Sequence, residues 1–424
     1  MTTNLHKLSD RLFAGEISTR EPEHHPFAMQ AELAEVSDSV AFYKHFVNLT
    51  ALRTEAGLVL IDTGPFQHGV QQAMYQGIRA WSSERIHTAI YTHGHVDHAY
   101  GLPPYLQESS ERGWARPEII AHSHVRARME RYIETAGYNS IINSRQFGLD
   151  LSWPTDPIYP TTSYDSRLRL MVGGTELLLF HARGETDDHS WVFLPGERVL
   201  CTGDLFIWAV PNAGNPQKVQ RYCIDWSRAL REMAALEPAV LLPGHGLLIE
   251  GEARVRNALL DTADYLESLY EQTLALMNRG ATVDEIIHSV RPPAELSERP
   301  YLQPVYDEPE FIVRNVYRCL GGWYDGIPSE LKPASRAEQA RTISELAGGA
   351  GALLTRARRA EADGNLRLAC HLVDWAAEAE PGSREVWELR AGIYERRTAA
   401  ESSTMSRGVF GDAARRSRAR AEAD

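Results

Sequence analysis

Residues 92–98 read Thr-His-Gly-His-Val-Asp-His, so three imidazoles and one carboxylate fall within the six residues from His93 to His98. The stretch directly follows an apolar run, Ile86–Tyr91, that is typical of a buried strand. Imidazole and carboxylate groups suit Zn²⁺ and similar divalent cations. In an extended loop His93 and His95 can point one way while Asp97 and His98 turn toward a second position. The loop can therefore serve two metal ions at a strand end, where α/β folds place their sites.

Short apolar runs and helical stretches alternate on both sides of this loop. Before it, residues 58–61 form a buried run that ends in Asp62-Thr63-Gly64, and a helix is predicted near 69–81. After it, the pattern predicts helices near 123–135 and 225–235, and strands near 118–121, 167–172, 176–181, 190–194, 198–201 and 239–242. Strand-rich halves interleaved with helices predict an α/β fold whose sheets are covered by helices.

From about residue 256 the strand signals stop and helical periodicity takes over. Helices are predicted near 261–277, 282–290, 310–321, 337–346, 352–363, 366–378 and 384–401. The last three are similar to tetratricopeptide (TPR) repeat units, which gives a TPR-like interpretation of this part. Residues 413–424 are rich in Ala, Arg and Glu, which predicts a frayed helix or a disordered end.

The composition narrows the class of protein. A chain of 424 residues predicts two or three domains. Four widely spaced cysteines exclude a disulfide framework and a cysteine zinc ribbon, and they suit a reducing compartment. A net charge of −13 argues against a nucleic-acid or anionic-membrane partner. The first twenty residues hold no apolar segment of signal-peptide length, and no apolar run approaches the roughly 18 residues that span a bilayer. We therefore expect a cytoplasmic location.

The loop at 92–98, together with the upstream Asp62-Thr63-Gly64, resembles the metallo-β-lactamase superfamily. Members of that family fold as an αββα sandwich and usually hold two metal ions. The resemblance implies further ligands downstream, in Thr202-Gly203-Asp204 and in Pro243-Gly244-His245. It also implies one nineteen residues before Asp204, where Glu185 stands in place of the histidine of many members.

The resemblance thus implies a binuclear centre of two divalent ions, expected to be zinc, around a metal-bridged hydroxide. Asp204 is expected to bridge the ions, and both Asp97 and Asp204 are expected to be catalytic. Asp62 is expected to support the ligand loop as a hydrogen-bond acceptor. The implied ligands are His93, His95 and Glu185 for one ion, and Asp97, His98 and His245 for the other.

Within the superfamily, Glu185 resembles the alkylsulfatase branch, whose members carry a helical dimerisation domain after the metal domain. Residues 315–328, Asn-Val-Tyr-Arg-Cys-Leu-Gly-Gly-Trp-Tyr-Asp-Gly-Ile-Pro, are similar to the hallmark of that domain. The resemblance implies a catalytic domain over residues 1–258, an all-helical, TPR-like dimerisation domain over 259–400 and a C-terminal tail over 401–424. It also implies a homodimer.

The branch implies hydrolysis of a small-molecule substrate, an alkyl sulfate ester. An anionic ester needs local positive charge, which forked arginine side chains supply well. Arg145 and Arg221 are predicted to bind the substrate, and His181 and His189 are predicted to line its pocket. Three alternatives stay open: a hydrolase of carboxylic esters or lactones, suggested by the more generic Thr-Gly-Asp204 bridge; a di-iron redox enzyme; and a scaffold that binds a partner through its TPR-like helices.

Overall fold

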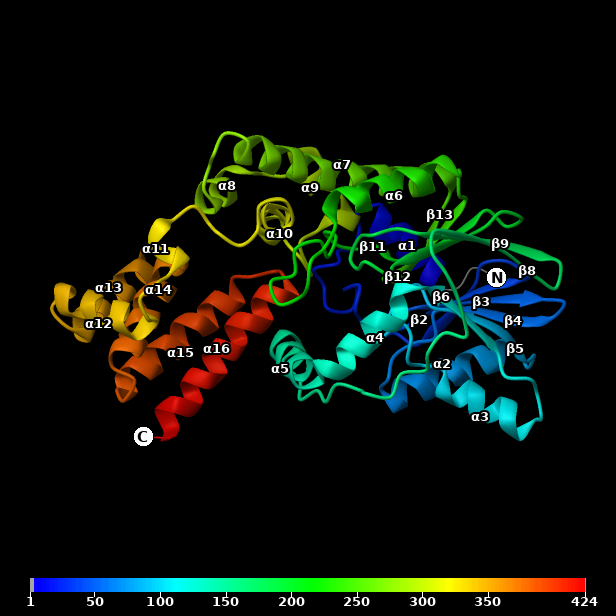
Figure 1. Ribbon diagram of the computed structural model, residues 1–424, viewed down its shortest axis with the longest axis horizontal. Helices are drawn as coiled ribbons and strands as arrows, with labels where there is room; N and C mark the ends of the chain where they lie inside the picture. The colour runs from blue at the N-terminus through cyan, green and yellow to red at the C-terminus, as the bar shows by residue number, and fades with distance from the viewer. Residues whose placement is uncertain (1–3, 424) are drawn as a thin grey trace. The chain divides into compact units, whose positions relative to one another are not determined.

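The computed structural model describes residues 4–423 (Figure 1). The described chain forms two compact units. The first comprises residues up to 136 together with residues 153–322, and the second comprises residues 137–152 together with the chain from 323 onward.

The first unit contains two β-sheets. Seven strands form one sheet in chain order, antiparallel from β1 to β4 and parallel from β4 to β7. They are β1 (Glu32–Glu35), β2 (Val40–Lys44), β3 (Leu49–Thr54), β4 (Gly57–Ile61), β5 (Ile86–Ile90), β6 (Glu118–His122) and β7 (Thr162–Tyr164). The parallel pairs place the carboxyl ends of β4 and β5 at one edge of the sheet.

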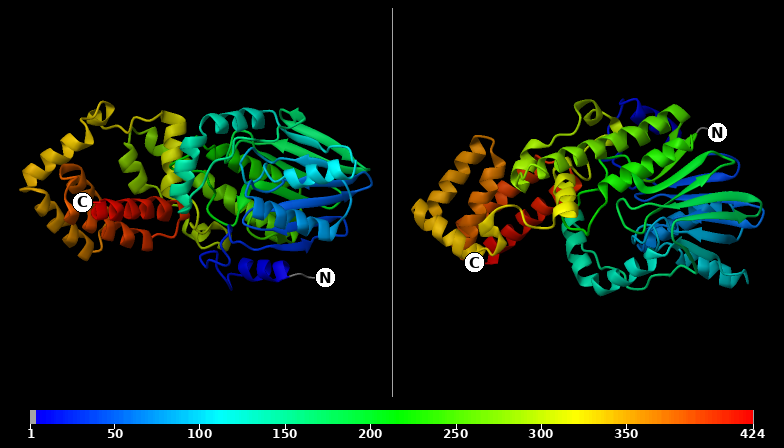
Figure 2. Two further views of the ribbon diagram at one scale, coloured as in Figure 1. Left: turned by 90° about the horizontal axis from the view of Figure 1, so that it is seen from below. Right: turned by 45° about the horizontal axis from the view of Figure 1, so that its top comes forward.

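The other sheet has six strands in the order β13-β12-β11-β10-β9-β8, and only β11 and β12 pair in parallel. Its strands are β8 (Arg167–Val172), β9 (Thr175–His181), β10 (Ser190–Leu194), β11 (Val199–Ile207), β12 (Val240–His245) and β13 (Ile249–Glu250). The two sheets lie as two layers, which the right-hand view of Figure 2 shows. The strand predicted to end at Cys201 continues to Ile207, so Asp204 lies within β11 rather than after it.

Alternating side chains explain how the two layers and their covering helices share the core. In β4, Val59 and Ile61 belong to the cluster that includes the second sheet, whereas Leu58 and Leu60 belong to the cluster that packs with α2. Successive residues of a strand face opposite sides of a sheet, so a strand buried on both sides reads as one apolar run. This αββα sandwich confirms the predicted fold class.

Helices flank both sheets of the first unit. The helices are α1 (Asn4–Phe13), α2 (His68–Trp81), α3 (Pro103–Glu111), α4 (His124–Glu134), α6 (Cys223–Ala235), α7 (Glu252–Met277), α8 (Val283–Ser289), α9 (Ala294–Ser297), the 3-10 helix η1 (Pro300–Leu302) and α10 (Pro309–Gly321). Helices α6 and α7 pack beside β11 and β12, and α2 packs beside β1 and β2. Among the described residues, no helix is both long and apolar enough to cross a membrane.

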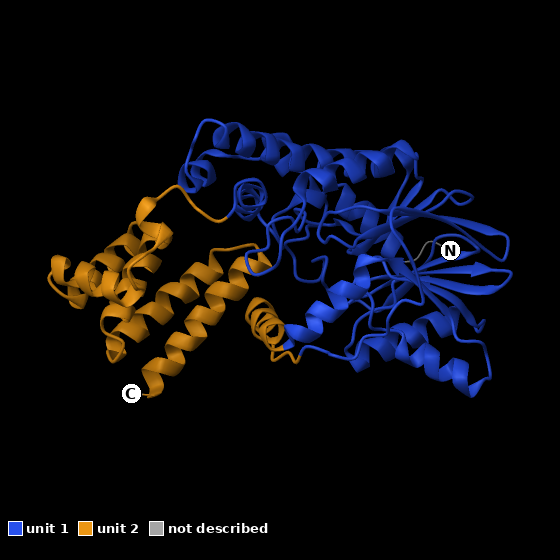
Figure 3. Cartoon of the chain, viewed as in Figure 1, with its two compact units in different colours: residues 1–136, 153–322 blue, residues 137–152, 323–424 orange. Residues whose placement is uncertain are grey.

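The second unit is helical, as predicted (Figure 3). It contains α11 (Pro328–Leu331), α12 (Arg336–Ala347), α13 (Ala350–Ala362), α14 (Leu366–Ala379), α15 (Arg384–Ala399), α16 (Thr404–Ala423) and all but the first residue of α5 (Ala136–Phe147). Small apolar residues such as Ala357, Ala369 and Ala376 fill the space between the helices. The end of the chain, predicted as a frayed helix or disorder, forms α16, which packs on α15.

Two features of the helices differ from the sequence prediction. Helix α5 was not predicted, because residues 136–147 carry few apolar side chains at helical spacing. The predicted boundary between residues 258 and 259 falls inside α7, which is continuous from Glu252 to Met277. That boundary and the TPR-like interpretation of the last helices stay predictions.

Candidate metal centre

Four segments of the first unit bring the predicted ligands together. The loop after β5 carries His93, His95, Asp97 and His98, and the loop between β9 and β10 carries Glu185. Asp204 lies in β11 and His245 ends β12, its parallel neighbour. The site thus forms where both sheets present the carboxyl ends of parallel strands.

One group of four residues, His93, His95, Glu185 and Asp204, can offer ligand atoms within 4.8 Å of one another. Glu185 Oε2 lies 3.6 Å from His93 Nε2 and 3.5 Å from His95 Nδ1. Asp204 Oδ2 lies 3.9 Å from His93 Nε2. These separations leave room for one cation between the four side chains.

A second group consists of Asp97, His98 and His245, whose possible ligand atoms also lie within 4.8 Å of one another. Asp97 Oδ2 lies 3.6 Å from His98 Nε2 and 3.4 Å from His245 Nε2. The other oxygen of Asp204, Oδ1, lies 3.2 Å from His98 Nε2 and 3.4 Å from His245 Nε2. Asp204 therefore directs one oxygen toward each group, as a bridging carboxylate does.

Three buried atoms of the two groups indicate that a positive ion belongs between them. His98 Nε2, Glu185 Oε2 and Asp204 Oδ1 have no hydrogen-bond partner among the described residues. Buried polar atoms without a partner are costly, so native proteins seldom leave them unpaired. All three aim into the space between the ligands. The donor set of nitrogen and carboxylate oxygen therefore fits two divalent metal ions.

The electrostatics of the site favour a cation as well. Burial, helped by nearby Asp204 and opposed by Arg221, raises the pKa of Glu185 to about 8. Burial and the neighbouring rings of His98 and His95 hold the pKa of His93 well below its usual value. The raised pKa of Glu185 means that its negative charge is costly in this buried place without a cation beside it. The lowered pKa of His93 keeps its imidazole neutral, which is the form that binds metal.

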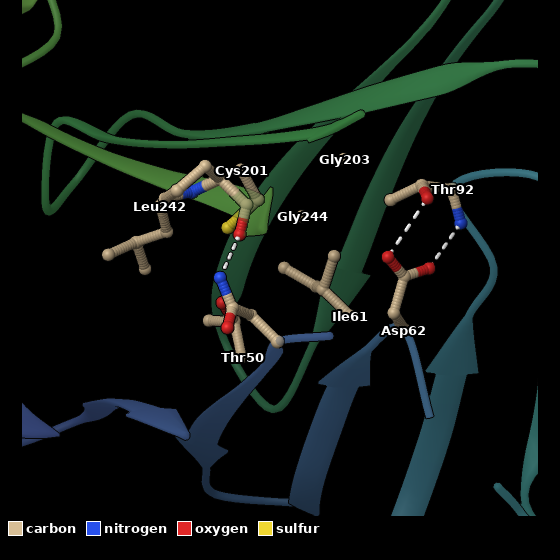
Figure 4. Close-up of a pocket in the computed structure, with 10 residues that line it drawn as sticks. Thr50, Ile61, Asp62, Thr92, Cys201, Gly203, Leu242 and Gly244 are labelled. Carbon is tan, nitrogen blue, oxygen red and sulfur yellow. Dashed lines mark hydrogen bonds between the residues drawn. The ribbon is translucent and has the colours of Figure 1, made fainter. Parts of the chain in front are cut away.

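A chain of hydrogen bonds orients the imidazoles from behind. His93 Nδ1 donates to Thr92 Oγ1 over 3.0 Å, and Thr92 Oγ1 donates to Asp62 Oδ2 over 2.9 Å. His98 Nδ1 donates to the same Asp62 oxygen over 2.7 Å, and the backbone N–H of Thr92 donates to Asp62 Oδ1 over 2.8 Å. Figure 4 shows the paired contacts between Asp62 and Thr92. His93 and His98 thereby keep Nε2 for a metal, which is the supporting role predicted for Asp62.

A buried ion pair holds the ligand loop between His93 and His95. Asp188 accepts a hydrogen bond from the backbone N–H of Gly94 over 2.9 Å and another from Arg128 Nε over 2.7 Å. Burial alone would raise the pKa of Asp188, but Arg128 and the other donors lower it to about 2. Asp188 therefore stays ionised and fixes Gly94 between His93 and His95.

Glu185 is held by two further side chains. Asn212 Nδ2 donates to Glu185 Oε1, and Arg221 donates to the backbone carbonyl of Glu185. Arg221 is buried, and its guanidinium lies 3.6 Å from Glu185 Oε1. Both contacts leave Oε2 directed at the first ligand group.

The structure places the predicted substrate-binding residues in different surroundings. His189 stacks on His93 with ring centroids 4.6 Å apart, and its Nε2 accepts the backbone N–H of Asp204. His181 stacks on His122 and donates from Nδ1 to the carbonyl of His189. Arg145 lies in the second unit, where it pairs with Asp412 at 3.3 Å. Contact of Arg145, Arg221, His181 and His189 with substrate stays a prediction.

Several residues that shape the centre were not predicted from the sequence. Asn212, Asp188 and Arg128 act through partners that lie far along the chain, so no local spacing marks them. Lys218 places a further amino group near the centre. Burial and Arg221 lower the pKa of Lys218 to about 7, whereas Glu185 and Asp97 act to raise it. The available signal was the position of Lys218 three residues before Arg221, which was predicted to bind the substrate.

Comparison with known proteins places this geometry in a family. The model of the metallo-beta-lactamase superfamily matches residues 43–245, and the model of alkyl sulfatase dimerisation matches residues 282–420. A linear primary-alkylsulfatase of Pseudomonas is 26% identical over 360 residues, covering 80% of this chain and 68% of the relative. An (R)-specific secondary-alkylsulfatase of Pseudomonas is 26% identical over 388 residues, covering 86% and 58% respectively.

A solved structure gives the same result for the fold. The stereoselective inverting sec-alkylsulfatase Pisa1 from Pseudomonas superposes with a TM-score of 0.82 at 24% sequence identity, covering 91% of this chain and 66% of that one. The chain thus spans 58–68% of the length of these relatives.

The fold, the ligand loop and the family match define a member of the metallo-β-lactamase superfamily. The helical match at 282–420 then assigns the chain to the alkylsulfatase branch of that superfamily, which confirms the resemblance seen in the sequence.

Proposed function

We propose that this protein is a binuclear metal-dependent hydrolase of alkyl sulfate esters. The observation that carries the proposal is Asp204, whose two oxygens face two separate ligand groups. Membership of the alkylsulfatase branch supports the choice of a sulfate ester. The ligands we propose are His93, His95 and Glu185 for one ion, Asp97, His98 and His245 for the other, and Asp204 for both.

The chain's own residues set up the chemistry. When bound, two divalent cations lower the pKa of water and polarise an ester oxygen, and we propose zinc in both positions. Asp62, Asn212 and Arg221 hold the ligands in orientation, and Lys218 adds positive charge near Glu185 and Asp97 when its amine is protonated, below a pKa of about 7. Local cations matter because the substrate is an anion and the chain has a net charge of −13. Hydrolysis adds water across the ester and yields an alcohol and sulfate.

A substrate panel tests the scissile bond. We expect the purified protein with two zinc ions per chain to release equal amounts of sulfate and alcohol from primary and secondary alkyl sulfates. Ion chromatography would measure sulfate, and gas chromatography would measure the alcohol. Turnover of p-nitrophenyl esters or lactones without any sulfate would instead support the carboxylic ester hydrolase. Stoichiometric iron with little zinc in the active protein would favour the redox alternative.

We also propose that the protein works as a homodimer through its helical part. The match to a dimerisation family at residues 282–420 supports this. Large apolar side chains are exposed there: Trp323 is 72% exposed, Leu331 is 52% exposed and Leu346 is 84% exposed. Exposed apolar patches commonly mark interaction surfaces.

Light scattering tests the assembly. We expect a mass near twice that of the chain at micromolar concentration. Replacing Leu346 by Glu should shift the mass toward the monomer, because a buried charge in an interface is costly. The control is Arg341→Glu, at an exposed position of the same helix, α12, and it should keep the mass of the dimer. A monomer in the unaltered protein would contradict the proposal. The cytoplasmic location stays a prediction from the sequence.

A further inference from the structure

Asp307 is a fully buried carboxyl that lies outside the ligand groups, two residues before α10. Its Oδ2 accepts the backbone N–H of Gly214 over 2.6 Å, and its Oδ1 accepts the backbone N–H of Glu308 over 2.7 Å. Asp307 and Gly214 are 93 residues apart in the sequence. A single carboxylate therefore ties the loop between β11 and α6 to the start of α10.

Two further contacts fix the loop between β11 and α6 against the chain from Gln303 to α10. The backbone N–H of Val210 donates to the carbonyl of Gln303 over 3.0 Å. A Cβ on Gly214 would lie 2.2 Å from the backbone nitrogen of Ile312 and 2.3 Å from the carbonyl carbon of Phe311. Such distances are far below van der Waals contact, so only glycine allows the loop to approach α10 this closely. The close approach is what brings the Gly214 amide to Asp307.

The same loop reaches the metal centre through Asn212, two residues before Gly214. Asn212 Nδ2 donates to Glu185 Oε1. With Oε1 engaged, Oε2 is the oxygen directed at His93 and His95. Any shift of the loop would move Asn212 and release Glu185 to rotate. Residues that hydrogen-bond to metal ligands, as Asn212 does to Glu185, set the orientation of those ligands. Removing such a residue commonly lowers metal affinity about 10–100-fold.

We propose that Asp307 is a positioning residue for the metal centre: by holding Gly214 it fixes Asn212, which in turn presents Glu185 to the first ligand group. The inference rests on the metal centre of the proposed function and does not depend on the sulfate ester as substrate. Asp307 touches none of the proposed ligands, so its effect passes through the loop.

The protonation of Asp307 bears on this role. Burial, helped by the charge of Glu308, raises the pKa of Asp307 to about 7, against the lowering effects of the two backbone amides and of Arg221. Tyr265 and Cys223 are further titratable groups within electrostatic reach of Asp307. The ionised form accepts both amides. A protonated carboxyl has an O–H on one oxygen, so one amide is left with a weaker acceptor as the pH falls through about 7.

Replacement of Asp307 by Asn tests the proposal. The amide keeps the shape but turns an N–H₂ toward one of the two backbone donors. We expect the affinity for one of two Co²⁺ ions to fall about tenfold, with the other ion unchanged. Competition with a chelator measures affinity, and the visible absorption of bound Co²⁺ reports a changed coordination sphere. The affinity of the unaltered protein for that ion should fall more steeply between pH 8 and pH 6 than that of Asp307→Asn.

The matched control is Asp261→Asn. Asp261 also anchors a neighbouring segment, since it accepts from Tyr301 Oη and pairs with Arg299 at 2.8 Å. Asp261 does not bind the loop between β11 and α6, so both Co²⁺ affinities should stay at the level of the unaltered protein. A control that loses Co²⁺ affinity as much as Asp307→Asn would show a general structural effect and overturn the proposal.

A double variant tests the route. Because Asp307 acts through Asn212, adding Asp307→Asn to Asn212→Ala should weaken Co²⁺ binding little beyond Asn212→Ala alone. If the double variant lost Co²⁺ affinity by the product of the two single losses, the proposal would be overturned. An unchanged Co²⁺ affinity in Asp307→Asn alone would overturn it as well. Should that variant fail to fold, hydrogen exchange on the unaltered metal-free protein decides. Protection of the Gly214 amide supports the tether, and exchange at the rate of an open loop refutes it. These readouts hold even if no alkyl sulfate is hydrolysed.

Discussion

Replacing Asp204 by Ala is expected to abolish binding of at least one of the two metal ions and to lower kcat/KM by at least about a thousandfold. Metal ions contribute several kcal/mol to transition-state stabilisation in such sites, and about 1.4 kcal/mol corresponds to a factor of ten in rate. Asp204 is the side chain with an oxygen near each ligand group, at 3.2 Å from His98 Nε2 and 3.9 Å from His93 Nε2. Elemental analysis and a sulfate-release assay on the same sample would measure both effects.

The protein offers a matched control for this variant. Glu21, Glu23 and His24 also place possible ligand atoms within 4.8 Å of one another, but both glutamates are exposed. Replacing His24 by Ala should leave two ions per chain and full activity, because exposed acidic groups bind ions weakly in water. A fully metallated, fully active Asp204→Ala protein would show that the two groups are not joined by this carboxylate.

Replacing Asp62 by Asn is expected to weaken metal binding about 10–100-fold and to destabilise the fold by about 3 kcal/mol. The Asp62 carboxylate accepts three hydrogen bonds, from the backbone and hydroxyl of Thr92 and from His98 Nδ1. A carboxamide has one acceptor oxygen, and its N–H₂ would face a donor in this buried place. His98 would then lose the partner that keeps its Nε2 toward the metal. Calorimetric titration with Zn²⁺ and urea unfolding of the metal-free protein would separate the two effects.

Thr92→Val provides the graded comparison for Asp62→Asn. Valine keeps the volume of threonine and removes the hydroxyl that links His93 to Asp62, while the bond from His98 to Asp62 remains. The loss of affinity should therefore be smaller than in Asp62→Asn and should concern the ion near His93. Equal losses in the two variants would mean that Asp62 does not act through His98.

The sequence predicted the part of the centre that is local in the chain. His93, His95, Asp97 and His98 share one loop, and an apolar run of strand length stands directly before it. An α/β fold whose sheets are covered by helices was also predictable, since strand-length apolar runs alternate with helical stretches up to about residue 256. The αββα arrangement itself was implied by the resemblance to a family. Glu185, Asp204 and His245 were named only through resemblance to a family, because nothing in their spacing shows that they meet.

The supports of the ligands could not be predicted in this way. Arg128 and Asp188 are 60 residues apart, and Asp307 and Gly214 are 93 residues apart. In a single sequence, such residues look like any other charged or small residue, since their partners are set by strand register and loop packing. Arg145 shows the same limit: its ion pair with Asp412, 267 residues away in the sequence, was not predicted, and its contact with substrate stays a prediction.

The sequence by itself determined which chemistry the protein can perform, because one short loop carries four metal-binding side chains after a strand that must be buried. The tertiary structure decided how that chemistry is organised. Parallel pairing of β4 with β5 and of β11 with β12 brings Asp62 behind the loop and Asp204 between the two ligand groups. The physical reason is that imidazole and carboxylate affinity for metals belongs to each side chain, whereas their convergence and their buried hydrogen bonds exist only once distant strands have paired.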